Sequence, residues 1–208
     1  MEKRWQMQTR KFLRTMREFK KTAYHDYGNR PWSVVKFIYY SAFKRNSFVV
    51  VGFPLDKAIP DCPLDSDFTV IKPTLEELRK LRAGKELPRE FYYDEFHGVR
   101  RCYVALCAGD LAYIHWVYVK GDYNRFLRLS EGVAELNYNT CLPKHRGRGL
   151  MAKMIVYIFR DLQKDGFRMA VGVAHAENPP ALKSTFKAGF REIGRIRTLG
   201  PFSRKFRI

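Results

Sequence analysis

Two glycines and two arginines lie together in the stretch from Leu142 to Met151, and this combination suits the binding of an anion. Arg146, Gly147, Arg148 and Gly149 directly precede a run with helical spacing. Glycine lets a backbone come close to a ligand, and the free N–H groups at a helix start attract negative charge. The stretch predicts a phosphate or pyrophosphate site, although a tight strand-to-helix connection could use the same residues.

Spacing rules out several other kinds of site. The stretch is not Gly-x-x-x-x-Gly-Lys-Ser/Thr, so the triphosphatase P-loop is excluded, and it lacks the three-glycine dinucleotide fingerprint. The four cysteines, at 62, 102, 107 and 141, form no Cys-x-x-Cys pair and have no paired histidines. We therefore expect no metal site and no disulfide framework, and reduced thiols in a cytoplasmic setting.

The elements around the stretch alternate between strand and helix. A strand is expected over 133–142, with Glu135, Asn137 and Asn139 on one face and Leu136, Tyr138 and Thr140 on the other. A helix follows to about residue 164 and ends before Gly166. Further strands are expected at 68–71, 99–108, 111–119, 169–174 and 190–197, with a tight Gly109-Asp110 turn and with helices opening at Thr74 and Pro179.

Positive charge is concentrated at the amino-terminal end. The 208 residues carry a net charge of +18, and the first 45 hold twelve basic and three acidic side chains. Helical spacing predicts two basic helices there, with a strand over 47–53 and a Pro/Asp-rich connector over 54–67. The chain is thus expected to divide into a basic extension, 1–66, and a main domain, 67–208.

This charge favours anionic partners without selecting one. No run of eighteen apolar residues exists, and the start lacks the apolar core of a secretory signal, so a cytoplasmic protein is expected. The helix expected over 31–45 fits packing on its own domain, or peripheral contact with an anionic membrane. No RNA-binding motif is visible, and no nucleic-acid partner is expected.

A second block adds to the loop. Asn178-Pro179-Pro180-Ala181 opens one helix, and Ala188-Gly189-Phe190 leads into the next strand. With Arg146-Gly147-Arg148-Gly149 this resembles the GNAT superfamily of acyl-CoA-dependent N-acyltransferases over about 133–195, although Met151 stands where Gly or Ala is usual. The resemblance implies a mixed α/β fold, in which helices flank a central twisted mixed sheet behind a helix–strand extension. It also implies transfer of an acetyl group from acetyl-CoA to a primary amine of a small molecule.

The resemblance also implies roles for individual residues. An amide near Cys141 or Leu142 would bind the thioester carbonyl. Glu135 would be the proton acceptor, because an ungapped comparison puts it on the catalytic glutamate of the histone acetyltransferase branch; a solvated or salt-bridged carboxylate is the alternative. Asn137, Asn139 and His115 would bind substrate, or be exposed or packed bystanders. The cofactor-binding set is Cys141, Leu142, Arg146, Gly147, Arg148, Gly149, Leu150, Met151 and Asn178.

One departure weakens the catalytic reading. Many members of the family have an acidic tyrosine seven residues after the asparagine, where this chain has Thr185. A non-catalytic acyl-CoA sensor or scaffold with the same fold is therefore the alternative. The extended layout is similar to acetyltransferases encoded among exopolysaccharide biosynthesis proteins, which would make the acceptor an amino sugar or a nucleotide-linked sugar. A homodimer fits the resemblance as well as a monomer.

Overall fold

The computed structural model describes Trp32, Val35, Tyr39 and residues 45–199 and 205–208. Those first three residues are helical, and the rest of the two basic helices expected before residue 45 lies outside the described residues. Ser47–Ile196 and Arg204–Ile208 form one compact unit, which contains every element discussed below apart from the ends of two strands.

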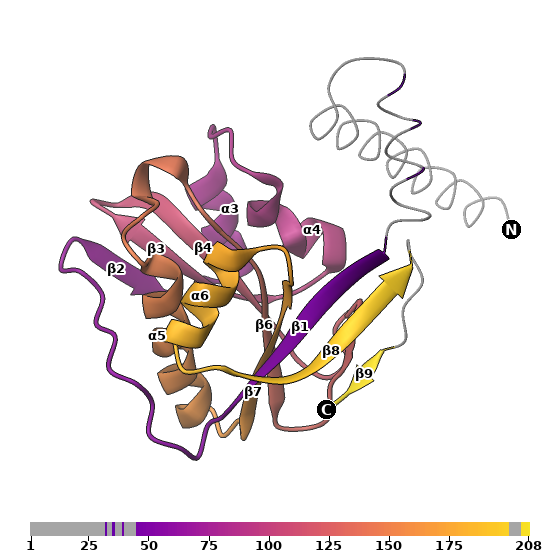
Figure 1. The fold of residues 1–208 in the computed structure, drawn as a ribbon. Coiled ribbons are helices and arrows are strands. Elements are labelled where there is room, and N and C mark those ends of the chain that lie inside the picture. The colour runs from indigo at the N-terminus through magenta and orange to yellow at the C-terminus, as the bar shows by residue number, and fades with distance from the viewer. Residues whose placement is uncertain (1–31, 33–34, 36–38, 40–44, 200–204) are drawn as a thin grey trace, which may run out of the picture. The chain divides into compact units, whose positions relative to one another are not determined.

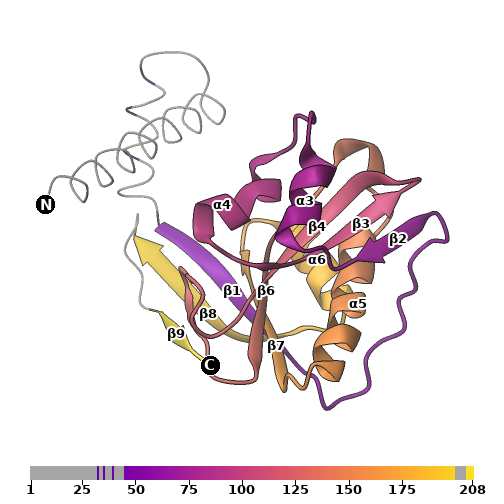
Figure 2. The ribbon, with the colours of Figure 1, turned by 180° about the vertical axis from the view of Figure 1, so that it is seen from behind.

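A seven-stranded sheet is the centre of this unit (Figures 1 and 2). In order across the sheet the strands are β2 (Phe68–Ile71), β3 (Arg101–Cys107), β4 (Asp110–Tyr118), β6 (Val133–Cys141), β7 (Met169–His175), β1 (Arg45–Pro54) and β8 (Arg191–Leu199). Neighbours from β2 to β6 pair antiparallel, as do β7 and β1, whereas β6 and β7 run parallel. The mixed sheet expected from the sequence is thereby confirmed.

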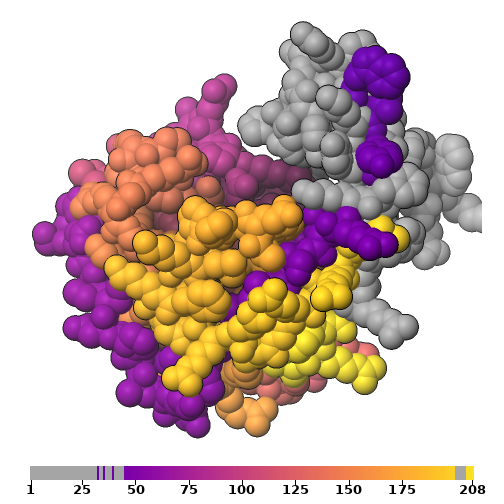
Figure 3. All heavy atoms as spheres, viewed as in Figure 1, coloured from indigo at the N-terminus to yellow at the C-terminus, as the bar shows by residue number. Residues whose placement is uncertain are grey.

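Helices cover both faces of the sheet. On one face α5 (Leu150–Lys164) and α6 (Pro179–Lys187) lie side by side, as the orange and yellow-orange atoms of Figure 3 show. On the other face lie α3 (Leu75–Arg82), the short 3-10 helix η1 (Arg89–Tyr92) and α4 (Tyr93–His97). Each face has its own apolar core, one built on α5 and one on Leu78, Phe91 and Trp116. A separate two-stranded sheet joins β5 (Leu127–Arg128) to β9 (Phe206–Arg207).

Local signals in the sequence explain several helix and strand ends. Thr74 Oγ1 accepts the Glu77 N–H at 3.2 Å, and the Glu77 carboxylate accepts the Thr74 N–H at 2.7 Å, which confirms the expected capping box. Helix α5 ends at Lys164 as expected. The β3–β4 turn is shifted by one residue, because Ala108 and Gly109 take the positive φ angles and Asp110 already belongs to β4.

Strand β1 is an inner strand of the sheet, next to edge strand β8, although the sequence analysis placed it in the extension. It pairs with β7 from Phe48 to Pro54 and has β8 on its other side. Val49, Val50 and Val51 are at most 3% exposed. A continuous apolar run is typical of a strand that is covered on both faces, and such a strand also needs hydrogen-bonding neighbours at both edges. The division of the chain into an extension, 1–66, and a main domain, 67–208, stays a prediction.

Strand β6 contains a bulge that the alternation did not reveal. Its register against β4 shifts between Ile114 and Trp116, and Tyr138 has a φ of 51°. An extra residue changes which face the following side chains occupy. Leu136 accordingly belongs to the core on the α5 face, whereas Tyr138 packs on the opposite core. The expected common face for Leu136 and Tyr138 was therefore wrong.

Candidate functional site

The two parallel strands in the centre of the sheet separate soon after they begin. β6 and β7 pair only from Val133 opposite Met169 to Glu135 opposite Val171. The next residue of β7, Gly172, has no side chain to fill the gap, and a Cβ there would lie 3.2 Å from the Leu136 carbonyl oxygen. Beyond this point the strands are free to diverge, as expected from the sequence. Two cavities open along this gap.

The loop between β6 and α5 has the geometry of an anion site. Gly147 and Gly149 have φ angles of 80° and 69°, which side-chain-bearing residues rarely adopt. Gly149 is the N-cap of α5, no side chain caps the helix, and its first turn has no acidic residue. The first N–H groups of a fifteen-residue helix thus have no side-chain acceptor.

A cleft with a volume of about 770 Å³ lies against this loop. Most of the expected cofactor-binding set lines it: Cys141, Arg146, Gly147, Gly149, Leu150, Met151 and Asn178, together with Asn139. Arg146 and Lys183 bring positive charge, and no carboxylate is found among the lining residues that the structure describes. Arg148 and Leu142 are not among them.

Arg148 is held by acidic residues of the connector instead. Its guanidinium donates to Asp67 at 2.7 Å and to Asp65 at 3.0 Å, and it lies over the Phe68 ring. The hydrogen bonds from Arg148 lower the pKa of Asp67 to about 2. The positive charge of Arg148, which the sequence analysis assigned to the ligand, is therefore paired within the protein. Only the backbone of Arg148 remains as part of the anion-binding loop.

Of the two backbone amides expected near the thioester carbonyl, at Cys141 and Leu142, the amide of Leu142 already has an acceptor within the protein. Leu142 N–H donates to the Ala112 carbonyl at 2.9 Å, so that donor is used within the sheet. The Cys141 thiol donates to the Leu142 carbonyl at 3.6 Å, and burial raises the pKa of this thiol. The hydrogen bond of the Cys141 thiol and its raised pKa both fit a structural role for this side chain.

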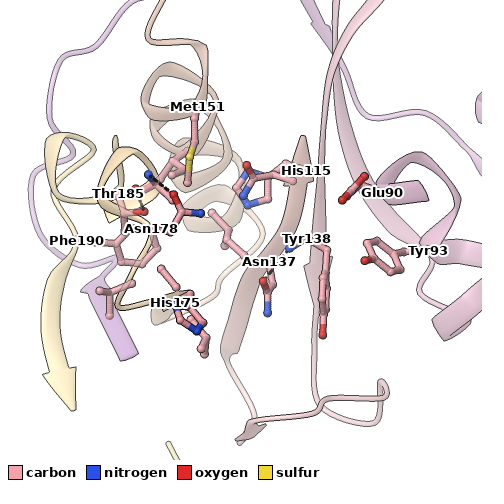
Figure 4. Close-up of a pocket in the computed structure, with 18 residues that line it drawn as sticks. Glu90, Tyr93, His115, Asn137, Tyr138, Met151, His175, Asn178, Thr185 and Phe190 are labelled. Atoms are coloured by element: carbon pink, nitrogen blue, oxygen red, sulfur yellow. Dashed lines mark hydrogen bonds between the residues drawn. The ribbon is translucent and has the colours of Figure 1, made fainter. Parts of the chain in front are cut away.

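The second cavity is a pocket of about 240 Å³ inside the gap between the strands. It reaches residues on both faces of the sheet, from Met151 and Ile155 of α5 to Glu90 of η1 and Tyr93 of α4. Three expected substrate-binding residues, His115, Asn137 and Asn139, line it, as do Thr185 of α6 and Asn178, the N-cap of that helix (Figure 4). The named residues come from five separate segments of the chain, which the fold brings together.

His115 is a buried histidine on the wall of this pocket. It is 1% exposed, and its Nδ1 lies 2.9 Å from the Tyr113 hydroxyl. Its Nε2 makes no close hydrogen bond with the described residues, although the Leu136 backbone interacts with the ring and raises its pKa against the effect of burial. Burial lowers the pKa of His115 to about 3, so the ring is neutral at physiological pH.

Glu135 lies behind the pocket wall and is not among the lining residues. It is 1% exposed, and the side-chain amides of Asn124 and Asn137 donate to its two oxygens, the second at 2.8 Å. Burial raises the pKa of Glu135 to about 7, against a smaller lowering effect of the Asn137 hydrogen bond. The carboxylate thus fastens the segment around Asn124 to β6, and its role as the proton acceptor stays a prediction.

Thr185 does not replace the missing tyrosine. Its side chain lines the pocket, but its hydroxyl donates to the Ala181 carbonyl at 2.8 Å, one turn back in α6. A hydroxyl held in this way caps a helix carbonyl.

Sequence reasoning missed Glu90, Tyr93 and Gly172. The segment that carries Glu90 has no periodic pattern, and no element was expected over 89–97. Gly172 stands inside a strand, where an isolated glycine can indicate close approach of another backbone, and this signal was available.

The described residues offer neither a metal site nor a membrane-spanning helix. Within the described ranges, no group of three or more His, Cys, Asp or Glu side chains could hold a metal ion. No helix in the same part of the chain combines the length and apolar character that a membrane-crossing segment requires.

The sequence matches no family model and no curated protein, whereas its fold matches many solved structures. A GCN5-related N-acetyltransferase from Sphaerobacter thermophilus aligns with a TM-score of 0.55 at 14% identity, over 85% of this chain and 58% of that one. A protein from Novosphingobium aromaticivorans, described as a GNAT-family acetyltransferase, aligns with a TM-score of 0.51 at 19% identity, over 74% and 63%.

The glucosamine N-acetyltransferase region of a fungal multi-domain GH3 β-N-acetylglucosaminidase gives a TM-score of 0.60 at 14% identity, over 81% of this chain and 23% of that one. This chain therefore spans about three fifths of the first two structures and a smaller part of the third. At these identities the likeness concerns the fold. The described part of this chain has the fold of the GNAT acetyltransferases.

Proposed function

We propose that this protein transfers an acetyl group from acetyl-CoA to a primary amine of a small molecule. One observation carries the proposal: the parallel strands β6 and β7 separate after three paired residues, next to a glycine-rich helix start that faces a cleft. The N–H groups at the helix start would bind the diphosphate of the cofactor, and the gap between the strands would admit its thioester arm. The GNAT fold of the solved structures supports the same conclusion.

The residues of the cleft fit such a cofactor. The uncapped start of α5 and the Arg146 guanidinium would hold the diphosphate, and the lining of the cleft places no carboxylate against it. Asn178 lines both cavities, at the place where an acyl chain would pass from one to the other. When bound, acetyl-CoA supplies an activated acyl group whose thiolate is a good leaving group.

The transfer requires a neutral amine. The amine nitrogen bonds to the acyl carbon, the carbon–sulfur bond breaks, and the departing sulfur takes up one proton. An acceptor that arrives as an ammonium ion releases two protons in all, of which one remains on the thiol and one goes to the solvent. A carboxylate at the pocket would hold the first of them.

The proposal extends to substrate and location. An amino sugar in polysaccharide biosynthesis is the proposed acceptor, supported by the exopolysaccharide-like layout of the sequence and by the glucosamine N-acetyltransferase region among the similar structures. A cytoplasmic protein that makes peripheral contact with an anionic membrane fits the net charge of +18.

A non-catalytic acyl-CoA sensor is the second candidate. The hydrogen bond from Thr185 to Ala181 favours it, because the pocket then has no hydroxyl acid at the position where related enzymes have tyrosine.

Turnover separates the two candidates. The purified protein is mixed with acetyl-CoA and a panel of primary amines that includes glucosamine, and release of the CoA thiol is followed by a thiol reagent. Titration calorimetry with acetyl-CoA measures binding. The proposal predicts both binding and amine-dependent thiol release; binding without release supports the sensor, and absence of binding contradicts both.

A further inference from the structure

Among the described residues that line the inner pocket, Glu90 is the only carboxylate. The described lining contains no lysine or arginine, although the protein has a net charge of +18. Figure 4 shows Glu90 and Tyr93 beside β6, across the pocket from Asn178 and Thr185. A small pocket with one carboxylate and no cation attracts positively charged ligands.

The backbone that carries Glu90 is firmly held. The Trp116 indole, on β4, donates to the Glu90 carbonyl at 2.6 Å. The neighbouring Phe91 carbonyl accepts from Arg82 at 2.6 Å, and Arg82 is paired with Asp94 at 2.7 Å, with both side chains buried. A short 3-10 helix anchored at two successive carbonyls keeps its backbone, and so the point from which the Glu90 side chain extends, in a fixed position.

The carboxylate of Glu90 forms no salt bridge with the described residues, in contrast to the carboxylates on the loop side of the sheet. Asp65 and Asp67 are each paired with basic side chains, and Glu135 is enclosed by two amides. Glu90 is thus the one carboxylate of the pocket lining and is partly exposed.

Two neighbouring groups also point to a ligand in this pocket. His115 is 1% exposed and lines the pocket; its Nε2 makes no close hydrogen bond with the described residues, although the Leu136 backbone interacts with the ring and raises its pKa against the effect of burial. The Tyr93 and Tyr138 rings lie 4.6 Å apart, and both line the pocket. Aromatic rings beside a carboxylate favour an ammonium group.

We propose that Glu90 binds the ammonium group of the acceptor and takes up its proton, and that the acceptors are amines with no anionic group next to the nitrogen. The second part follows from the absence of lysine and arginine in the described lining, because a carboxylate or phosphate near the amine would have no cation to pair with. This inference rests on the proposed function and names the acceptor class of the same site.

The proton moves from the ammonium group of the acceptor to the Glu90 carboxylate before the acyl group is transferred. The nitrogen–hydrogen bond of the ammonium breaks, the proton moves to a Glu90 oxygen, and the neutral amine keeps the electron pair with which it forms the bond to the acyl carbon. The proton then leaves Glu90 for the solvent, which restores the carboxylate for the next cycle.

Three variants test the assignment. Glu90→Gln removes the charge at the pocket, Glu86→Gln removes the same charge on an exposed residue of the preceding segment, and Glu135→Gln removes the buried carboxylate. Circular dichroism and melting confirm that each variant is folded. We expect Glu90→Gln to lower kcat/KM for amines about a hundredfold, a usual size for loss of a general base, and Glu86→Gln to leave it within about twofold. A fall confined to Glu135→Gln would overturn the proposal.

Acceptor class is tested with matched pairs that differ by a carboxylate on the carbon that bears the amine: tyramine and tyrosine, tryptamine and tryptophan, histamine and histidine. We expect the member without the added anion to have a kcat/KM at least about tenfold higher, as loss of a single charge interaction would give. Equal rates, or preference for the anionic members, would overturn the assignment of the acceptor class.

Measuring the binding of amines directly tests the role of Glu90 without relying on turnover. Calorimetry measures the binding of tyramine, cadaverine and glucosamine to the wild-type and Glu90→Gln proteins saturated with CoA. Weaker binding by the variant supports the role of Glu90 even if no thiol is ever released, an outcome that would refute the proposed function alone. Equal binding by both proteins, or no binding of any amine to the wild type, would overturn the role of Glu90.

Discussion

The two cavities along the gap between β6 and β7 differ in charge and in size. Among the described lining residues, the outer cleft of about 770 Å³ has Arg146 and Lys183 and no carboxylate, whereas the inner pocket of about 240 Å³ has Glu90 and neither lysine nor arginine. One end of the gap is therefore suited to an anion and the other to a cation. Two ligands of opposite charge would approach the same point from opposite faces of the sheet.

The contrast also shows how the overall charge can mislead. The excess of basic residues predicts anionic partners, yet Asp65 and Asp67 near the loop form ion pairs with basic side chains of the protein itself, and the described lining of the inner pocket contains no lysine or arginine. Local composition of a cavity, rather than net charge, decides what it binds.

The largest expected effect comes from closing the gap. In Gly172→Val the new Cβ would lie 3.2 Å from the Leu136 carbonyl oxygen and 3.3 Å from a Val51 methyl group, and the added methyl groups would extend further into the pocket. We expect amine-dependent thiol release to fall to background. Thr69→Val, on the exposed side of edge strand β2, is the control and should retain activity. Full turnover by Gly172→Val would show that the gap is not the route of the acyl group.

Glu135 should make stability depend on pH. Its pKa is raised by burial from 4.5 to about 7, so the folded state holds this proton more tightly than the unfolded state. The resulting stabilisation is complete below pH 4.5 and is lost as pH rises through 7. The free energy of unfolding of the wild type, relative to Glu135→Gln, should fall by about 3 kcal/mol between pH 4.5 and 8. Urea unfolding at several pH values measures it, and a difference that is constant with pH would contradict the buried state of the carboxylate.

The two arginines of the loop should differ although both changes remove the same charge. Arg146 lines the cleft, so Arg146→Ala should weaken acetyl-CoA binding by about tenfold, the effect of losing one charge-assisted hydrogen bond. The Arg148 guanidinium faces Asp65 and Asp67, so Arg148→Ala should change the affinity by less than about threefold and slightly lower the melting temperature. Calorimetry and thermal melting measure both, and equal losses of affinity would show that the guanidinium of Arg148 leaves its acidic partners for the ligand.

Much of the site could be predicted because it is local in sequence. Gly147, Gly149 and the start of α5 follow one another along the chain, and their geometry depends on positive φ angles that glycine itself indicates. The capping box at Thr74 and the helix ends were predicted for the same reason. Residue type and spacing carry this information without any knowledge of the tertiary fold.

The rest depends on contacts between distant segments. Arg148 meets Asp67 across about eighty residues, and no local pattern shows that the arginine is already paired. The bulge at Tyr138 is defined by the register against β4, so the simple alternation of β6 could not reveal it. Glu90 reaches the pocket because Trp116 and Arg82 anchor η1, which is again a property of the folded chain.

The place of β1 between β7 and β8 has a consequence for synthesis on the ribosome. Val51 pairs with Gly172, about 120 residues later, so this apolar strand leaves the ribosome long before either of its neighbours exists. The emerging chain must carry an unpaired hydrophobic segment until nearly all of the protein has been made, and such segments are prone to aggregate. Efficient production of this protein should therefore depend on a chaperone that covers residues 48–53 during translation.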